Sequence, residues 1–203
     1  MKVGIVNYSI GNVGSVYSAF QFYRYDVRLV SHPKELDAVD MIVLAGVGNF
    51  TTAVHRLKTL DFWDSLNESV QIKKKPLLGI CLGMQLFGDV SYEDGENAGF
   101  GWIKGRVEKI QGEALRLPHM GWNAVAPIND GLFRGIRSLA FYFMHSYRFI
   151  PEETEVVAAT TQYGSSSIVS SIRKDHIVGV QFHPEKSQGD GLRFLKNVVE
   201  TLA

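Results

Sequence analysis

The only cysteine of the chain, Cys81, lies between two glycines in the stretch GICLG at 79–83. The residues before Cys81 are typical of a buried strand and those after it favour a helix, which is the chain pattern of a nucleophile elbow. At such a turn the N-terminus of the following helix favours a thiolate. A lone cysteine is also often a buried structural residue. We interpret Cys81 as a nucleophile because a core strand has little reason to accept flanking glycines, which forfeit packing and cost backbone entropy.

His183 is predicted to be the base that works with this nucleophile. The stretch GVQFHPE at 179–185 ends a strand in His183, continues with proline and places Glu185 two residues further on. Residues two apart in an extended segment point to the same face, so Glu185 can hold one ring nitrogen while the other faces Cys81. This is the arrangement of nucleophile, base and orienting acid.

A histidine at a strand end that bonds to backbone is the commoner alternative for His183. Two of the other histidines, His119 and His145, stand in motif-like stretches, whereas the segments around His32, His55 and His176 look exposed or turn-like. Only His183 has an acid at the offset that a triad requires.

The segment AGVGNF at 45–50 follows a predicted strand, where parallel sheets usually bind ligands. Its glycines, Gly46 and Gly48, let the backbone approach a ligand. It lacks the pattern of a phosphate-binding loop. We therefore interpret it as an oxyanion loop, in which N–H groups near Gly48, together with the N–H of Leu82, would stabilise a tetrahedral intermediate. Gln85, one turn after Cys81, either faces the same pocket or is an exposed helical residue.

The order of elements predicts an α/β fold with a central, mostly parallel sheet flanked by helices and additional antiparallel strands in the C-terminal half. Strands are predicted at 2–7, 26–30, 40–45 and 76–80, and helices around 13–20, 53–70 and 190–202. Further strands are predicted at 102–110, 122–126, 139–145, 155–160, 166–171 and 176–181. These later strands are too closely spaced for a helix between each pair, so that several must run antiparallel.

Length and charge narrow the class of protein. The 203 residues are expected to form a single domain, 1–203. Lys and Arg total 21, as do Asp and Glu, so a zero net charge gives no long-range attraction to nucleic acid or to a membrane surface. The chain shows no signal-peptide pattern, no apolar run long enough to span a membrane and no possible internal disulfide, so we expect a cytoplasmic protein. We expect neither a cofactor nor a metal.

Taken together, these motifs resemble those of the class I, triad-type glutamine amidotransferases, which have a flavodoxin-like fold. GICLGMQ and FHPEKS resemble the wider family, and further stretches are similar to the glutaminase subunits of imidazole glycerol phosphate synthase. The matching stretches are GICLGMQL at 79–86, GVGNF at 46–50, PHMGWN at 118–123, YFMHSY at 142–147 and QFHPEKS at 181–187.

The resemblance implies that the chain hydrolyses L-glutamine to glutamate and ammonia for histidine biosynthesis. It also implies a protein partner, a cyclase subunit with a (β/α)8 barrel that receives the ammonia through a channel. By the same resemblance, Cys81, His183 and Glu185 match the triad, and Gly48 and Leu82 match the oxyanion donors. Gln85, Ser146 and Tyr147 match residues that hold glutamine, whereas Asn12, Trp122, Asn123 and Lys186 match segments that face the cyclase.

Two positions depart from the family pattern. Ala45 stands where proline usually precedes the oxyanion loop, and the N-terminal motif reads NYSIGN at 7–12 in place of the common DYGxGN.

Three other functions remain open at this point. These are a related amidotransferase subunit that supplies ammonia for surface-sugar amidination, a partner-independent Cys-His hydrolase such as a peptidase or γ-glutamyl hydrolase, and a regulatory binding module that has lost its chemistry.

Overall fold

The computed structural model describes residues 1–112, 115–128 and 131–203. In these ranges the main sheet has nine strands in the order β2-β1-β3-β4-β13-β12-β11-β8-β9. Its first five strands are mutually parallel. They are β1 (Lys2–Val6), β2 (Asp26–Val30), β3 (Met41–Gly46), β4 (Leu77–Cys81) and β13 (Ile177–Val180).

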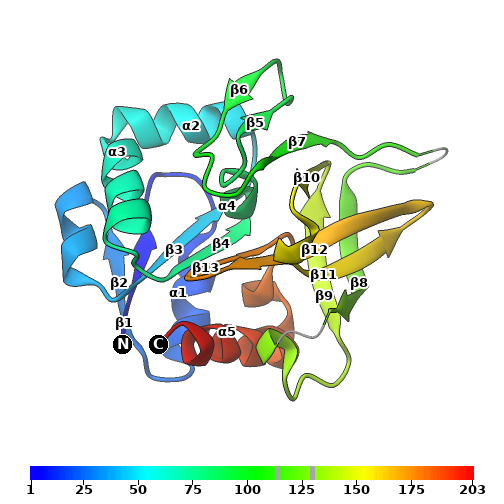
Figure 1. Cartoon of the computed structure of the whole chain (residues 1–203). Coiled ribbons are helices and arrows are strands. Elements are labelled where there is room, and N and C mark those ends of the chain that lie inside the picture. The colour runs from blue at the N-terminus through cyan, green and yellow to red at the C-terminus, as the bar shows by residue number, and fades with distance from the viewer. Residues whose placement is uncertain (113–114, 129–130) are drawn as a thin grey trace.

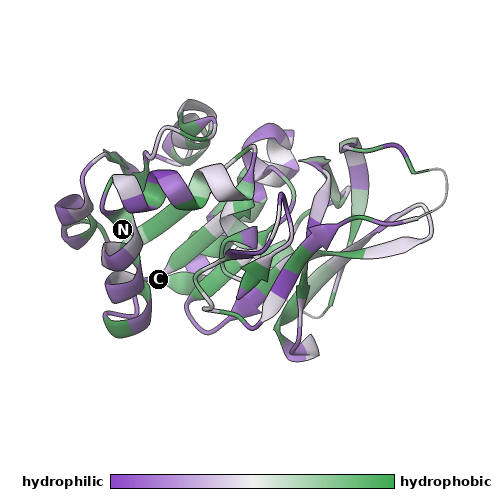
Figure 2. Ribbon diagram, turned by 90° about the horizontal axis from the view of Figure 1, so that it is seen from above, coloured by the Kyte–Doolittle hydropathy of each residue, from purple (hydrophilic) through white to green (hydrophobic). Residues whose placement is uncertain are grey.

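Helices cover both faces of the parallel half of this sheet, and this explains its continuous apolar strands. Every residue of β3 and of β4 is buried. One face packs against α1 (Val13–Gln21) and α5 (Gln188–Leu202), and the other packs against α2 (Phe50–Thr59) and α3 (Phe62–Asn67) (Figure 1). Seen from above, the central strands are apolar, whereas the helices also carry polar residues (Figure 2).

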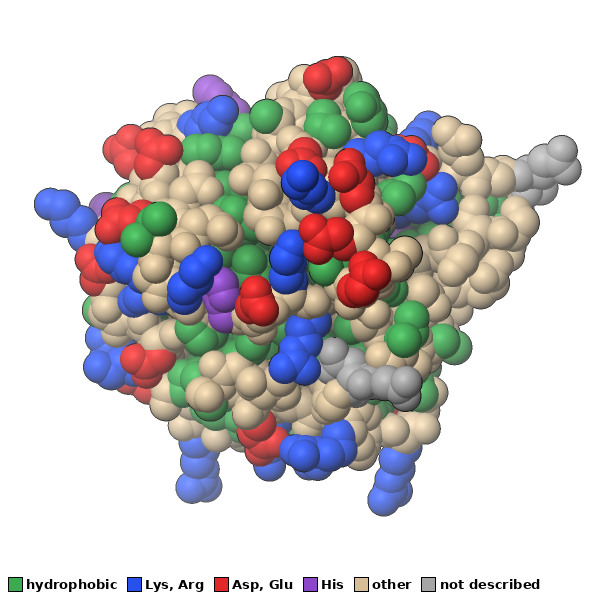
Figure 3. Space-filling view, in the orientation of Figure 1, with side chains coloured by type: hydrophobic (Ala, Val, Ile, Leu, Met, Phe, Trp, Pro, Cys, Tyr) green, Lys and Arg blue, Asp and Glu red, His purple; other side chains and the backbone are tan. Residues whose placement is uncertain are grey.

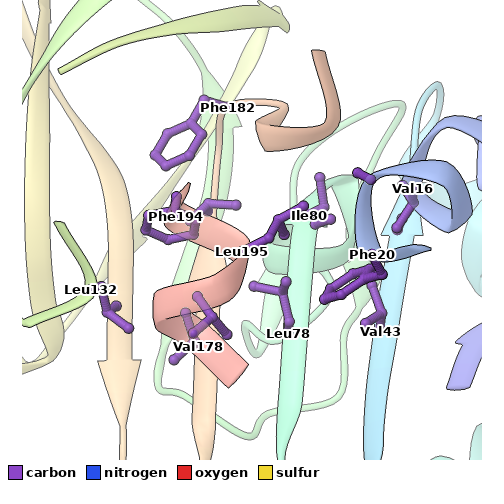
Figure 4. Close-up of a cluster of buried hydrophobic side chains, with 14 of the residues drawn as sticks. Val16, Phe20, Val43, Leu78, Ile80, Leu132, Val178, Phe182, Phe194 and Leu195 are labelled. Atoms are coloured by element: carbon purple, nitrogen blue, oxygen red, sulfur yellow. The ribbon is translucent and has the colours of Figure 1, made fainter. Parts of the chain in front are cut away.

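The core beneath α1 and α5 is built from side chains of both helices and of the central strands. Phe20 of α1 and Leu195 of α5 meet Leu78 of β4 in this cluster, and all three side chains are fully buried (Figure 4). Each fully buried side chain of this size stabilises the fold by about 1.5–3 kcal/mol. The predicted apolar faces of the first and last helices therefore pack on the sheet.

The C-terminal half adds antiparallel strands, as predicted. The main sheet continues with β12 (Ser166–Lys174), β11 (Val157–Tyr163), β8 (His119–Pro127) and β9 (Ala140–His145). A four-stranded sheet contains β10 (Tyr147–Pro151), β7 (Gly105–Lys109), β5 (Val90–Ser91) and β6 (Asn97–Ala98). Only Ser146 separates β9 from β10, so the chain passes from one sheet to the other at this residue. The predicted fold class, α/β with antiparallel additions, is confirmed.

Several predicted elements are wrong in extent. The single helix expected at 53–70 is two helices, because Asp61 adopts a left-handed φ of 59° that ends the first one, and a π-helical turn, Glu68–Ile72, follows the second. The helix after Cys81, α4 (Leu82–Gln85), is only one turn long. The strand expected at 102–110 is confined to β7. Sequence reasoning missed β5, β6 and β10 as well as the short 3-10 segments Pro33–Ala38, Gly131–Phe133, Thr154–Val156 and Pro184–Lys186.

Acidic and basic side chains are interspersed over the face of the molecule that Figure 3 shows. This distribution agrees with the zero net charge of the sequence. Within the described ranges, no helix is both long and apolar enough to span a membrane.

Candidate active site

The topology of the parallel strands brings three sequence-predicted segments to one edge of the sheet. β4 lies between β3 and β13, and all three strands run in the same direction. Their carboxyl ends therefore share an edge, which is where open α/β sheets bind ligands. The loop at 47–49 follows β3, Cys81 ends β4 and His183 comes three residues after β13.

Cys81 has the strained backbone of a nucleophile elbow. Its φ is 55° and its ψ is −109°, a conformation that non-glycine residues rarely adopt. The side chain is only 4% exposed. Its Sγ lies 3.8 Å from the carbonyl oxygen of Met144 and accepts a hydrogen bond from Nε2 of Gln181 at 3.5 Å.

The glycines on either side of Cys81 are required by packing, which corrects our expectation that a core strand has little reason to accept them. A Cβ on Gly83 would overlap the carbonyl oxygen of Leu44. A Cβ on Gly79 would overlap the ring of Phe87. The glycines therefore let α4 lie directly against β3 and β4, and this close contact holds the turn at Cys81.

His183 and Glu185 form a buried pair beside the cysteine. Nδ1 of His183 lies 2.8 Å from Oε1 of Glu185, and the two side chains are 2% and 3% exposed. Since a carboxylate can only accept, Nδ1 carries the hydrogen and Nε2 is left for other chemistry. Nε2 is buried and makes no hydrogen bond within the described part of the chain.

The charge state of His183 depends on Cys81. Burial alone lowers the pKa of His183, but its interactions with a Cys81 thiolate and with Glu185 outweigh burial and raise that pKa to about 10. The site therefore favours the imidazolium form of His183 at neutral pH, next to the sulfur of Cys81.

A cavity of about 300 Å³ opens over Cys81. This volume is at the lower end of the roughly 300–1,000 Å³ of small-molecule pockets. Predicted site residues line it, and they are Gly48, Cys81, Leu82, Gln85, Ser146 and Tyr147. Gln85, for which an exposed position was the alternative, is 4% exposed. Gly46 is buried, and a Cβ there would overlap the Tyr8 hydroxyl and lie 3.2 Å from Cβ of Leu82.

The predicted oxyanion donors border this cavity. Gly48 has a φ of 107°, which favours glycine, and a Cβ there would meet nothing within 4 Å. Leu82 is the first residue of α4, so its N–H has no acceptor within the helix. Both N–H groups can therefore serve a ligand in the cavity.

The N-terminal motif lies against Ala45, the position where the family usually has proline. Gly11, in the N-terminal motif, has a φ of 101°, and a Cβ there would lie 3.2 Å from the carbonyl oxygen of Ala45. In the same motif Tyr8 is fully buried, and its hydroxyl makes no hydrogen bond within the described residues. The N-terminal motif thus supports the start of the oxyanion loop.

The residues predicted to face a cyclase lie on the surface around α1, β8 and the turn after His183. Asn12 caps α1 by accepting from the N–H of Ser15 at 3.3 Å. Trp122 is 50% exposed and packs edge-on against Tyr142, over whose ring Nζ of Lys186 lies at 5.8 Å. Asn123 follows Trp122 on β8 and is half-buried, and its amide donates to the carbonyl oxygen of Gln162 at 2.8 Å.

Two residues of the site were missed. Gln181 donates to the Cys81 sulfur, and its position two residues before His183 is the only signal that could have found it. Glu93 lines the cavity from the turn after β5, which sequence reasoning left without a role. Burial raises the pKa of Glu93, the N–H of Phe50 lowers it by donating at 2.8 Å, and Asp94 raises it again. Within the described residues, no three His, Cys, Asp or Glu side chains are grouped to hold a metal ion.

Comparison with known proteins agrees with this geometry. Residues 5–201 match the family described as glutamine amidotransferase class-I. The chain therefore belongs to the class-I glutamine amidotransferases, and the family expected from the motifs is confirmed.

Relatives narrow this placement. The chain is 42% identical over 205 residues to the imidazole glycerol phosphate synthase subunit HisH of Pelagibacter ubique, covering 97% of this chain and 98% of that protein. It is 38% identical to the subunit of the same name from Zymomonas mobilis, with 98% and 95% covered. Within the amidotransferases the chain is thus a member of the HisH group.

Solved structures of lower sequence identity show the same fold. A glutamine amidotransferase superposes with a TM-score of 0.78 at 18% identity, covering 98% of both chains. A chain of the PurLQS structure from Thermotoga maritima superposes with a TM-score of 0.72 at 16% identity, covering 100% of this chain and 99% of that one.

Proposed function

We propose that this protein is a glutaminase that hydrolyses L-glutamine at Cys81 and supplies the ammonia to a synthase partner. The observation that carries the proposal is the position of Cys81, which lies on a strained turn beneath a cavity and beside the buried His183–Glu185 pair. The proposal treats residues 1–203 as one glutamine amidotransferase domain, and the match over residues 5–201 supports this view.

The cavity supplies groups that suit glutamine. Gln85 donates both of its amide hydrogens, to the carbonyl oxygen of Tyr147 and to Oε1 of Gln181, each at 2.9 Å. Its own Oε1 is then left to accept an N–H of the substrate amide. Glu93 offers a carboxylate to the α-ammonium group.

In the first half of the reaction the Cys81 thiolate attacks the side-chain amide carbon of glutamine. The carbonyl oxygen becomes an oxyanion, which the N–H groups of Leu82 and the Gly48 region stabilise. The imidazolium of His183 gives its Nε2 proton to the amide nitrogen, the carbon–nitrogen bond breaks and ammonia leaves. A γ-glutamyl thioester on Cys81 remains.

In the second half His183 is neutral and acts as a base. It takes a proton from water, whose oxygen attacks the thioester carbon, and the carbon–sulfur bond breaks. Glutamate and the Cys81 thiolate are released, and the imidazolium is restored. Glu185 keeps the Nδ1 hydrogen in place in both halves and stabilises the positive ring.

The partner we propose is a cyclase with a (β/α)8 barrel that uses the ammonia for histidine biosynthesis. The HisH relatives support this, since each is named as a subunit of imidazole glycerol phosphate synthase. The proposed docking face contains Asn12, Trp122, Asn123 and Lys186, and two of these, Trp122 and Lys186, both lie against the ring of Tyr142. We place the complex in the cytoplasm.

Glutamate release tests this function. The protein is assayed with glutamine, alone and with the cyclase subunit from the same organism, with and without the cyclase's nucleotide substrate. We expect slow release alone and a strong rise with the ligand-bound cyclase, and Cys81→Ala abolishes both. Near-normal release by Cys81→Ala would refute the mechanism. Equal rates with and without cyclase would favour a partner-independent hydrolase.

A further inference from the structure

An unbroken chain of hydrogen bonds runs from the surface of β8 to the cavity through two buried histidines. Nδ2 of Asn123 lies 3.1 Å from Nε2 of His119, and Nδ1 of His119 lies 2.9 Å from Nε2 of His145. Nδ1 of His145 lies 2.8 Å from the carbonyl oxygen of Tyr147. His119 and His145 are 3% and 6% exposed.

The groups at the two ends of this chain of hydrogen bonds determine which atom donates and which accepts in each bond. The Tyr147 carbonyl can only accept, so Nδ1 of His145 carries a hydrogen, and Nε2 of a neutral His145 accepts from Nδ1 of His119. Nε2 of His119 then accepts from the Asn123 amide. The Asn123 amide cannot turn over, because its Nδ2 also donates to the carbonyl oxygen of Gln162 at 2.8 Å and its Oδ1 accepts from the N–H of Ala124 at 2.8 Å.

An additional proton on either ring would disturb this order. If His119 were doubly protonated, its Nε2 hydrogen would point at the Asn123 amide hydrogen. If His145 were doubly protonated, its Nε2 hydrogen would point at His119, whose hydrogen would have to move to the Asn123 side. Burial lowers the pKa of His119 to about 4 and that of His145 to about 3; for His145 the Tyr147 carbonyl raises the pKa, and the charge of His183, together with any charge on His119, lowers it. Both rings are neutral at pH 7.

The position of His119 is itself held by ring stacking. Its imidazole lies between Phe143 and Tyr163, with ring centroids 4.7 Å and 4.1 Å away. This packing leaves the two nitrogens aligned with Asn123 and His145. The stack therefore orients a polar group in an apolar layer, which costs free energy unless both nitrogens are paired.

At its inner end the chain meets the substrate groups. The carbonyl oxygen of Tyr147 accepts from His145 and also from Nε2 of Gln85, which in turn donates to Gln181, and Gln181 donates to the Cys81 sulfur. We propose that His119 and His145 are positioning residues that hold the Tyr147 carbonyl, and through it Gln85, in the orientation that receives glutamine. The proposal rests on the glutaminase function proposed above, since it assigns Gln85 to the substrate amide.

Two variants of His119 separate positioning from packing. His119→Phe preserves the ring stack and removes both nitrogens, which leaves Nε2 of His145 and the Asn123 amide without their partner. His119→Gln offers one donor and one acceptor and can rebuild the chain. In the complex with its cyclase, we expect His119→Phe to raise KM for glutamine about fivefold or more, with kcat within about threefold of the original. We expect the KM of His119→Gln to lie close to that of the original protein.

His176→Phe is the matched control. His176 is a partly buried histidine whose Nε2 lies 2.8 Å from the carbonyl oxygen of Val70, and it precedes β13, at the end of that strand opposite to His183. We expect its KM and kcat to be unchanged. The proposal would be overturned by an unchanged KM in His119→Phe. It would also be overturned if folded His119→Gln raised KM as much as His119→Phe does.

The tautomers provide a readout that does not depend on activity. Nitrogen-15 NMR of the imidazole rings at pH 7 should show both His119 and His145 neutral and protonated at Nδ1. A charged ring or an Nε2–H tautomer at either position would overturn the proposed chain of hydrogen bonds, even if the variants could not be purified. If the original complex released no glutamate, the proposed function would fail. The nitrogen-15 spectra of the imidazole rings would still decide whether the chain of hydrogen bonds exists.

Discussion

Nδ1 of His183 lies 2.8 Å from Oε1 of Glu185, and the second carboxylate oxygen, Oε2, is buried and makes no hydrogen bond within the described residues. Within the described residues, the hydrogen bond from the His183 imidazole is therefore the interaction that holds this carboxylate. An acid with one unsatisfied buried oxygen costs free energy unless its charge is compensated, and the imidazolium of His183 provides that compensation. The pair is stable as a carboxylate and imidazolium, which is the form required before attack on glutamine.

Glu185→Gln should slow catalysis far more than it weakens binding. The amide can still contact Nδ1, but it loses the charge that stabilises the imidazolium and no longer dictates which nitrogen carries the hydrogen. We expect kcat for glutamate release to fall by roughly 10²–10⁴-fold with a much smaller change in KM. Steady-state kinetics of the complex measure both values. A loss confined to KM would show that Glu185 serves binding instead.

Cys81→Ala should lower the pKa of His183. Burial lowers this pKa, and the thiolate and Glu185 together raise it to about 10, so removing the sulfur removes the first of the raising causes. Imidazole carbon and nitrogen chemical shifts followed from pH 5 to 11 give the value directly. Glu185→Gln in the same titration gives the contribution of the carboxylate. An unchanged pKa in Cys81→Ala would mean that the sulfur is too distant to act on the ring.

The parallel half of the fold could be predicted because its signals are local. Each strand is a short apolar run bounded by charge, Pro or Gly, and the strands β1, β2, β3 and β4 lie within about a residue of their expected ends. The split between α2 and α3 could not be predicted in this way. It depends on the left-handed backbone of Asp61, and apolar spacing continues across it.

The site could be predicted where its residues are close in sequence. The residues that form the nucleophile elbow stand directly before and after Cys81 in the sequence, and Glu185 follows His183 by two residues. Gln181 and Glu93 were missed because their roles come from strand order and from a turn between small strands. The function of the elbow glycines was also interpreted wrongly, since the close approach of Leu44 to Gly83 is a long-range contact.

The free energy of unfolding should fall as pH is lowered from 6.5, and His119→Gln should reduce that fall. The pKa values of His119 and His145 are about 4 and about 3 in the folded protein, below the ordinary value of 6.5, so unfolding takes up protons in this range. Each ring contributes at most about 1.4 kcal/mol per pH unit. Urea titrations at several values between pH 7.5 and 5 measure the slope. The exposed His55→Gln is the control, and equal slopes for both variants would contradict the prediction.

Gly83→Ala should strongly destabilise the protein. The added Cβ would overlap the Leu44 carbonyl, and since that contact is between backbones the strand or the helix must move. We expect a loss of about 3 kcal/mol or more in the free energy of unfolding. Gly189→Ala is the matched control, because a Cβ at this position in α5 meets nothing within 4 Å. It should stabilise the helix by about 0.5–1 kcal/mol, as alanine favours helix over glycine.

Tyr8→Phe should leave the protein as stable as before or more stable. The Tyr8 side chain is fully buried beside the start of the oxyanion loop, and its hydroxyl makes no hydrogen bond within the described residues. Removing an unpaired buried hydroxyl removes its desolvation penalty, so the free energy of unfolding should rise by about 1 kcal/mol. Tyr163→Phe is the matched comparison, since the Tyr163 hydroxyl donates to the carbonyl oxygen of Arg116 at 2.5 Å. That variant should lose about 1 kcal/mol. Urea unfolding of the two variants side by side measures the difference, and a loss of stability in Tyr8→Phe equal to that in Tyr163→Phe would show that the Tyr8 hydroxyl has a partner in solution.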